Sequence, residues 1–273
     1  MCKALRCNLN LPLLRMFNLQ PRAYNLVLGI RFDNITISDV LSRFDQAIKN
    51  KEQLFCVTPN PEMCLLATRN KPFAEILNSA SLSIPDGFGI LWGSRYLNGK
   101  HSFLRWLFTL MTPWMSSSRS PLQARVSGVD VMREYLHQYP HRKIFLLGAS
   151  KAVNDRLTAK LKDQGVKVVG NFSGNDSEKL ALIIISMINA SEAEVLFVAF
   201  GAPKQEQWIA RHFSAFKTVR VAMGVGGAFD FFSGEKSRAP VWMQKIGLEW
   251  LFRLMNEPKR IKRIINATVV FPW

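Results

Sequence analysis

Short apolar runs alternate with helix-like segments along most of this chain of 273 residues. The runs have the length and composition of buried strands, and they cover residues 26–30, 54–57, 82–84, 144–147, 166–169, 195–200 and 219–223. Between them, segments such as 153–161 and 178–188 show helical periodicity. Strands that alternate with helices at this spacing form a parallel sheet covered by helices on both faces. The sequence therefore predicts an α/β fold with a mostly parallel sheet.

The chain divides into an α/β body and three additions that differ from it in composition. Residues 1–23 are a basic leader, and residues 24–235 are the body, which an aromatic and basic insertion interrupts at about 97–124. Residues 236–273 form the third addition. Apolar residues recur there at helical spacing, at Trp242, Ile246, Trp250, Leu251 and Leu254. We therefore expect a basic, amphipathic helical appendage after residue 236.

A net charge of +16 limits the partners of the chain to phosphorylated substrates, an anionic membrane surface or another polyanion. No run of about 18 uninterrupted apolar residues exists, so no helix should span a bilayer. The four cysteines form no CxxC pair, which favours reduced thiols over disulfides or a zinc site. We expect a cytoplasmic protein whose basic appendage and aromatic insertion dock it on the inner face of the plasma membrane.

Five of the predicted strands end in polar or glycine-rich segments, at residues 58–62, 85–89, 148–150, 201–206 and 224–227. Ligands of open α/β sheets bind at the carboxyl ends of the strands, where glycines let the backbone approach and helix N-termini attract anions. These segments together predict a phosphate- or nucleotide-binding rim. Neither a GxGxxG motif nor a Walker P-loop is present, which disfavours a standard dinucleotide fold and a phosphate-loop NTPase.

Asp86 is the carboxylate that this rim singles out. It follows an apolar strand and Pro85 and precedes Gly87, so its side chain should project from the carboxyl end of the strand. It could take a proton from an acceptor hydroxyl as a general base. It could equally be the N-cap of the following helix, a position that favours Asp.

Further polar residues at the strand ends have two interpretations each. Thr58 and Asn60 could serve the site or simply start a capped helix with proline in its first turn. Gln205 could donate to a sugar hydroxyl or a phosphate, or face solvent. Arg125 could be a surface residue or could bind a phosphate with both guanidinium nitrogens.

No metal or cofactor is expected. The chain has no DxD pair to hold a divalent ion against a nucleotide diphosphate. His137 and His141 are four residues apart, but Pro140 lies between them and disrupts the helix that would align them. Arginines and helix N-termini would then have to neutralise a diphosphate.

The motifs of the chain, taken in order, resemble the WecG/TagA/CpsF family of bacterial glycosyltransferases. The strings that carry the resemblance are TPNPEM, IPDGFGI, RVSGVDVM, FLLGAS, FVAFGAPKQEQWI and MGVGGAFDFFSGEKSRAPVWMQKIGLEWLFRLMNEPKRIKR. They run from about residue 26 to about residue 265, and the last two are long and specific. The resemblance implies a Rossmann-like core. It also implies an inverting, metal-independent transfer from a UDP-sugar to a polyprenyl-diphosphate-linked sugar, in the synthesis of surface polysaccharide or teichoic acid.

The resemblance also assigns roles to residues that match the family's motifs. Asp86 looks like the catalytic base, and the other active-site positions are Thr58, Asn60, Arg125 and Gln205. Arg253, Arg260 and Arg263 match appendage arginines that contact the diphosphate and assist membrane association. The remaining substrate-binding candidates lie at the rim, and they are Gly148, Gly201, Lys204, Gly226, Gly227 and Asp230.

Some questions stay open at the level of sequence. The insertion departs from the short link of most relatives, and the donor could carry N-acetylmannosamine, another hexosamine or glucose. Homo-oligomers are possible. A nucleic-acid-binding protein would also explain the charge, although no recognised motif supports it. A nicotinamide oxidoreductase on a similar fold is the third alternative, since fold does not determine function.

Overall fold

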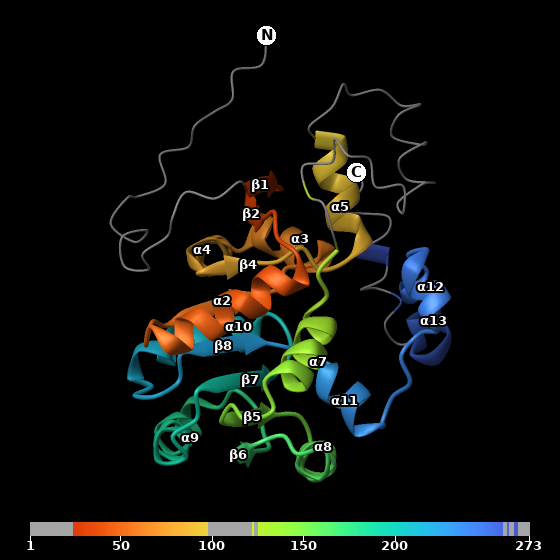
Figure 1. Cartoon of the computed structure of the whole chain (residues 1–273). Helices are drawn as coiled ribbons and strands as arrows, with labels where there is room; N and C mark the ends of the chain where they lie inside the picture. The colour runs from red at the N-terminus through yellow and green to blue at the C-terminus, as the bar shows by residue number, and fades with distance from the viewer. Residues whose placement is uncertain (1–23, 98–121, 123–124, 259–260, 262–264, 267–273) are drawn as a thin grey trace.

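A six-stranded parallel sheet forms the centre of the molecule (Figure 1). The computed structural model describes residues 24–97, 122, 125–258, 261 and 265–266. Across the sheet, the strands are β4 (Leu82–Ser83), β3 (Leu54–Val57), β8 (Val221–Gly224), β7 (Val195–Ala199), β5 (Ile144–Gly148) and β6 (Val168–Phe172). The predicted α/β class is confirmed. The leader and nearly all of the insertion lie outside the described residues.

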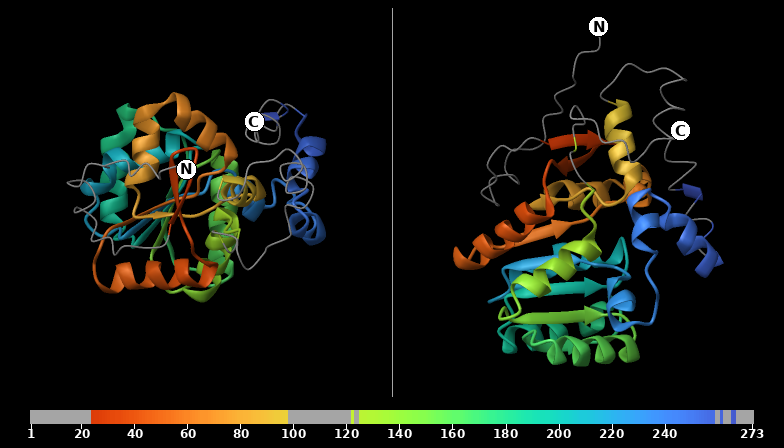
Figure 2. Two further views of the ribbon diagram at one scale, coloured as in Figure 1. Left: turned by 90° about the horizontal axis from the view of Figure 1, so that it is seen from above. Right: turned by 45° about the vertical axis from the view of Figure 1, so that its right-hand side comes forward.

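Helices cover both faces of the sheet because alternate strand residues point to opposite sides (Figure 2). Leu54 and Cys56 of β3 pack on one side, and Phe55 and Val57 on the other. The first side is covered by α2 (Ile37–Lys49), α7 (Gly128–Gln138), α8 (Lys151–Asp163) and α11 (Ala228–Ser233). The second is covered by α3 (Pro61–Arg69), α4 (Lys71–Ser79), α9 (Glu178–Ala190), α10 (Lys204–His212) and the short helix η2 (Phe213–Ala215). The result is one sheet between two apolar layers.

The prediction of a single strand at residues 26–30 is wrong. The structure places an antiparallel hairpin there, β1 (Tyr24–Val27) and β2 (Ile30–Asp33), in a sheet of its own. Leu28 and Gly29 both have positive φ, of 50° and 77°, which is the geometry of a tight hairpin turn. The apolar run therefore hid a turn, because a leucine occupies one of its two central positions. A smaller correction concerns β6, which begins two residues later than predicted.

The described residues that follow the body are helical, as predicted. Two helices follow the body, α12 (Val241–Lys245) and α13 (Glu249–Asn256). Trp242 is 60% exposed and Trp250 39% exposed, and α13 has no fully buried residue. The apolar residues Leu251, Phe252 and Leu254 of α13 are partly buried. No helix in the described ranges is long and apolar enough to cross a membrane.

Gly148 ends β5 at a point where two strands approach closely. Its φ is +105°, and an added Cβ would lie 2.8 Å from the carbonyl carbon of Ala199 in β7. Its carbonyl oxygen accepts a hydrogen bond of 2.8 Å from the side chain of Asn154. The close approach of β5 and β7 therefore explains why position 148 holds a glycine.

Candidate active site

Three chain segments are joined by backbone hydrogen bonds at the carboxyl ends of β3 and β4. The Ile84 N–H donates to Val57 O (3.0 Å), and the Asp86 N–H donates to Pro59 O (3.2 Å). On the other side, the Val126 N–H donates to Pro85 O (3.0 Å). These bonds place the segments that carry Thr58, Asp86 and Arg125 side by side, although up to 67 residues separate them in sequence.

A cavity of about 400 Å³ opens beside these segments, within the usual size of small-molecule sites. Its walls come from the ends of β3, β4, β7 and β8, from the start of α5 (Phe88–Leu97), and from α11 and α13. Ten of the predicted site residues line it, and they are Thr58, Asn60, Asp86, Arg125, Gly201, Gln205, Gly226, Gly227, Asp230 and Arg253. The predicted rim is thus a pocket that the appendage helps to close.

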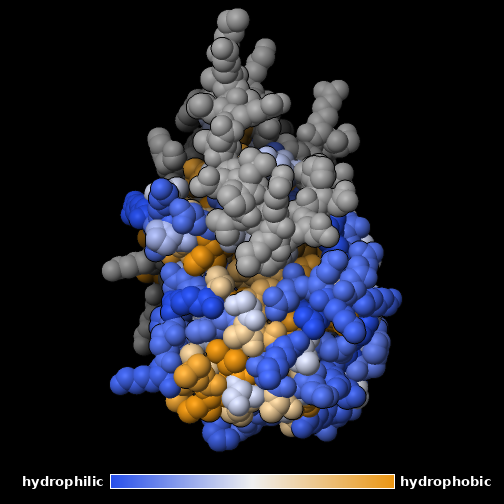
Figure 3. All heavy atoms as spheres, turned by 90° about the vertical axis from the view of Figure 1, so that its left-hand side faces the viewer, coloured by the Kyte–Doolittle hydropathy of each residue, from blue (hydrophilic) through white to orange (hydrophobic). Residues whose placement is uncertain are grey.

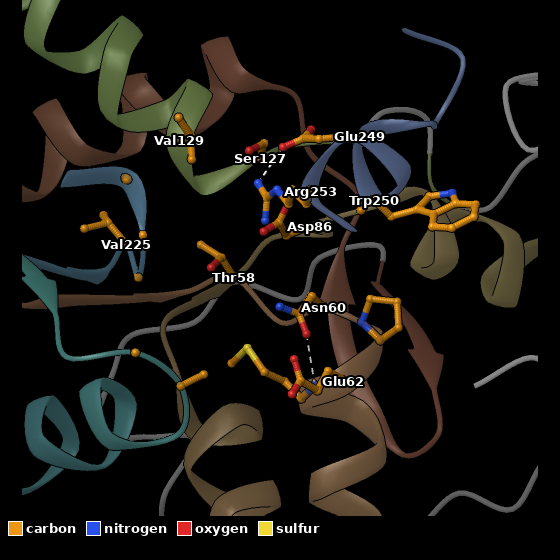
Figure 4. Close-up of a pocket in the computed structure, with 18 of the residues that line it drawn as sticks. Thr58, Asn60, Glu62, Asp86, Ser127, Val129, Val225, Glu249, Trp250 and Arg253 are labelled. Atoms are coloured by element: carbon orange, nitrogen blue, oxygen red, sulfur yellow. Dashed lines mark hydrogen bonds and ion pairs between the residues drawn. The ribbon is translucent and has the colours of Figure 1, made fainter. Parts of the chain in front are cut away.

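Asp86 points into the pocket beneath Arg253 and Glu249 (Figure 4). Burial raises the pKa of Asp86 to about 6, and the nearby carboxylates of Glu249 and Asp130 add to the rise. Arg253 and Arg125 act in the opposite direction. Within the described residues no donor hydrogen-bonds to the Asp86 carboxylate, so it does not cap α5. A carboxylate with this pKa is ionised at neutral pH and can accept a proton.

Arginines from three segments converge on Glu249, the first residue of α13. Arg125 Nη1 lies 3.3 Å from Glu249 Oε2, Arg253 Nη2 lies 2.5 Å from Oε1, and Arg238 Nε lies 3.9 Å from Oε1. Arg238 also binds both carboxylate oxygens of Asp130 in α7, at 2.6 and 2.9 Å. This network joins α13 to the body through charge and holds two arginines beside Asp86.

Two aromatic rings support the arginines. The guanidinium carbon of Arg125 lies 5.1 Å from the ring centre of Phe88, and that of Arg253 lies 5.4 Å from the ring centre of Phe231. A ring face attracts a cation and restricts the plane of the guanidinium group. Trp250, by contrast, points away from the Asp86 cluster (Figure 4).

Of the two interpretations of Asn60, the structure shows the start of a capped helix. Its Oδ1 accepts a hydrogen bond from the Met63 N–H (3.0 Å), so Asn60 is the N-cap of α3, with Pro61 in the first turn. The side chain nevertheless lies at the pocket wall, close to Glu62 (Figure 4). Thr58 is buried, and an added Cβ on Gly128 would lie 3.2 Å from its methyl carbon. The roles of both residues in substrate binding stay predictions.

Gln205 neither faces solvent nor has a free side chain. It is 3% exposed, and its Oε1 accepts hydrogen bonds from the backbone N–H groups of Gly201 (3.1 Å) and Gly226 (3.0 Å). Its Nε2 donates to Glu206 Oε1 at 2.8 Å. Both glycines have positive φ, of 79° and 52°. Gln205 therefore ties the loop after β7 to the loop after β8, which together form one wall of the pocket.

We expect Gln205→Leu to lower the free energy of unfolding by about 1–3 kcal/mol, because it leaves two partly buried N–H groups without an acceptor. Gln207→Leu, on the partly exposed neighbouring glutamine, is the matched control and should change it little. Chemical denaturation of both variants measures the difference. Equal stability of the two variants would contradict the positioning role of Gln205.

The other predicted site residues fall into three groups. Asp230 Oδ2 pairs with Lys236 Nζ at 3.0 Å at the pocket edge. Gly148 and Lys204 do not line the pocket, and Lys204 pairs with Asp176 at 3.0 Å near the protein surface. Arg260 and Arg263 lie outside the described residues. All these assignments stay predictions.

Sequence reasoning missed four charged residues of the site, namely Asp130, Lys236, Arg238 and Glu249. Each lies inside one of the motif strings, so the motifs contained the signal, but each residue looks like an ordinary surface charge until its partner is known. The sequence also did not indicate that Glu206, which does not line the pocket, is a buried acid. It is completely buried beside Gln205, and burial raises its pKa to about 7.

The side chains that could bind a metal ion are dispersed in the described structure. Across the described ranges, no three His, Cys, Asp or Glu side chains come close enough together to hold a metal ion. Cys56 and Cys64 are buried free thiols, and burial raises the pKa of both.

A parallel sheet with a polar pocket at the carboxyl ends of its strands is typical of α/β proteins that bind a ligand at this edge of the sheet. The chain belongs to the glycosyl transferase WecG/TagA/CpsF family, whose model matches residues 25–111 and 106–273. The resemblance found in the motifs is thereby confirmed. The chain is therefore a family glycosyltransferase.

Relatives from Staphylococcus aureus agree with this assignment. Proteins of strains MRSA252, MW2 and NCTC 8325 / PS 47 are each 31% identical to this chain over 249 residues, which cover 89% of both partners. Each bears the name N-acetylglucosaminyldiphosphoundecaprenol N-acetyl-beta-D-mannosaminyltransferase.

Proposed function

We propose that this chain transfers N-acetylmannosamine, with inversion, from a UDP-sugar to a sugar carried on polyprenyl diphosphate, in the synthesis of a cell-surface polymer. The observation that carries the proposal is Asp86, a carboxylate of raised pKa, placed beside Arg125 and Arg253 in a pocket of substrate size. The name of the staphylococcal relatives supports the choice of sugar and acceptor. Hexosamines other than N-acetylmannosamine, and glucose, are the competing donors.

Asp86 acts as the general base in this mechanism. It takes the proton of the acceptor hydroxyl while that oxygen attacks the anomeric carbon of the donor from the face opposite UDP. The bond from the anomeric carbon to the diphosphate oxygen breaks, and UDP leaves with the bonding electrons. Because the attack is in line with the departing bond, the configuration at the anomeric carbon inverts.

Arg125 and Arg253 are the groups placed to stabilise the departing diphosphate. Guanidinium groups bind phosphate oxygens through paired hydrogen bonds. Among the described lining residues, however, five carboxylates face three basic groups: Glu62, Asp86, Asp230, Glu249 and Glu257 against Arg125, Lys236 and Arg253. A diphosphate therefore needs further positive charge, which supports the expected roles of Arg260 and Arg263.

A donor screen tests the proposal. We expect UDP and UDP-N-acetylmannosamine to raise the melting temperature, NAD to leave it unchanged, and the other UDP-hexosamines to act more weakly. The same screen with NAD or with oligonucleotides separates the two alternative classes. Stabilisation by NAD or nucleic acid without stabilisation by UDP would overturn the proposal.

Turnover should not depend on a divalent ion, because arginines and not a metal are expected to stabilise the leaving group. We expect the transfer rate in excess EDTA to equal the rate without it. Loss of activity that magnesium or manganese restores would contradict this prediction.

We also propose that the protein works on the inner face of the plasma membrane, where a polyprenyl-linked acceptor is held. The basic appendage supports this location, since an anionic bilayer attracts basic residues by about 1 kcal/mol each near its surface.

A further inference from the structure

The β1–β2 hairpin presents apolar side chains to solvent. Tyr24 is 57%, Leu26 48% and Leu28 39% exposed, while Asn25 and Val27 between them are buried. Because strand residues alternate in direction, Tyr24 and Leu26 of β1 share one face of the hairpin, and Leu28 follows them in the turn. Leu97, 45% exposed, ends α5, which packs against β1 at the same end of the molecule (Figures 1 and 2).

The hairpin is firmly attached to the body. The Arg31 N–H donates to Asn78 Oδ1 (2.9 Å), Arg31 Nη2 donates to Ala80 O (2.6 Å), and Asn78 Nδ2 donates to Gly29 O (3.0 Å). On its inner side, Val27, Ile30 and Phe32 are buried in the core. The outward apolar face is therefore part of a fixed platform and does not need the hairpin to move.

The positive charge of the chain is concentrated in three ranges of its sequence. Residues 1–32, 91–126 and 258–273 contain fourteen basic residues and no acidic one. The rest of the chain is almost neutral, because these three ranges account for fourteen of the sixteen net positive charges. The first range contains β1, the second contains most of α5, and the third follows α13.

We propose that the exposed face of the hairpin, formed by Tyr24, Leu26 and Leu28 together with Leu97 of α5, is a membrane-contact surface that inserts at the headgroup boundary of an anionic phospholipid bilayer. Apolar side chains bounded by acid-free basic sequence fit such a surface, since the bases are attracted to anionic headgroups and the leucines leave water. Tyrosine suits the boundary because its ring is apolar and its hydroxyl remains hydrated.

A second apolar surface, on α9, lacks these features. Leu182 is 81%, Ile183 55% and Met187 40% exposed, and apolar residues gather on the lower part of the face seen in Figure 3. Glu178 at the start of α9 pairs with Arg211, and Glu192 after its end pairs with Lys143. Its surroundings therefore combine both signs of charge and do not favour an anionic bilayer.

The contact surface has a defined relation to the active site, a point that rests on the proposed function. Helix α5 starts at Phe88, which lines the pocket, and ends at Leu97 on the contact surface. At 1.5 Å per residue its length is about 15 Å. A bilayer touching Leu97 would thus lie one short helix from Asp86, within reach of a sugar linked through diphosphate to a membrane lipid.

Vesicle sedimentation of the full chain tests the inference without any substrate. The triple variant Tyr24→Ser/Leu26→Ser/Leu28→Asn removes the apolar face, with Asn at position 28 because it tolerates positive φ. The matched control, Leu182→Ser/Ile183→Ser/Met187→Ser, removes the apolar surface of α9. On vesicles of phosphatidylcholine with about one third phosphatidylglycerol, we expect tenfold or weaker binding of the hairpin variant and unchanged binding of the control.

Circular dichroism and a melting curve establish that both variants fold. Binding of a folded hairpin variant at the level of the unmodified protein would overturn the inference, and so would an equal loss in the α9 control. Transfer to a water-soluble acceptor with a short lipid should be the same in both variants and the unmodified protein. Absence of transfer in all three proteins would contradict the proposed function and leave the vesicle result intact.

Discussion

Asp86→Asn should lower turnover by about 10²- to 10⁴-fold, the usual contribution of a general base, while UDP binding and the fold are retained. The amide has the shape of the carboxylate but cannot accept the acceptor proton. The substitution should not disturb the fold, because no donor in the described ranges hydrogen-bonds to the Asp86 carboxylate. Steady-state transfer rates and UDP titrations measure the two effects separately.

The matched control is Asp155→Asn, which changes an exposed carboxylate on α8 whose ion pair among the described residues is with Lys151 in the same helix. Its turnover should equal that of the unmodified protein. A turnover of Asp86→Asn close to that of this control would exclude Asp86 as the base.

The pH dependence of kcat/KM should follow from the ionisation of Asp86. The base must be ionised to accept a proton, and the pKa of Asp86 is raised to about 6. We therefore expect kcat/KM to be constant above about pH 7 and to fall about tenfold per unit below pH 6, with this acid limb absent from the residual activity of Asp86→Asn.

Glu249→Gln should lower turnover by about 10- to 100-fold, the size of effect expected when catalytic groups are displaced by about 1 Å. The substitution removes the charge on which Arg125, Arg238 and Arg253 converge. The ion pairs of Glu249 with Arg125 and Arg238 connect α13, which has no fully buried residue, to the body. Arg125 and Arg253 would then lose their defined positions beside Asp86.

A pH profile separates this positioning role from a merely structural one. The Glu249 carboxylate raises the pKa of Asp86, so its removal should move the acid limb of the Glu249→Gln variant to lower pH. Glu235→Gln is the control, since Glu235 pairs with Arg156 at an exposed site. A Glu249→Gln variant with full turnover and an unshifted profile would show that the network does not act on the site.

The sequence predicted the layers of this fold because its signals are local. Parallel strands buried on both faces read as apolar runs, and six of the seven runs became strands of the main sheet. The run at 26–30 failed because its turn contains Leu28 in place of the usual Asn or Asp before glycine. Apolar periodicity alone could not distinguish a strand from a hairpin.

The site was harder to predict because its contacts join distant parts of the chain. Asp86 was found from its strand end, but Glu249 meets Arg125 across 124 residues of sequence. Gln205 was found as a site residue, but its hydrogen bonds to two glycine loops were not expected, and its contact with substrate stays a prediction. Residue type indicated which groups were polar, and only the fold shows which partners they have.

The most direct test of the account follows the anomeric carbon through the reaction. The full chain is incubated with isotopically labelled UDP-N-acetylmannosamine and N-acetylglucosaminyl-diphosphoundecaprenol, and the lipid product is examined by NMR. We expect a lipid-linked disaccharide with the configuration opposite to that of the donor, formed in equal amount with UDP and reduced at least a hundredfold in Asp86→Asn. A product with the donor's configuration, or UDP released without a lipid-linked disaccharide, would contradict it.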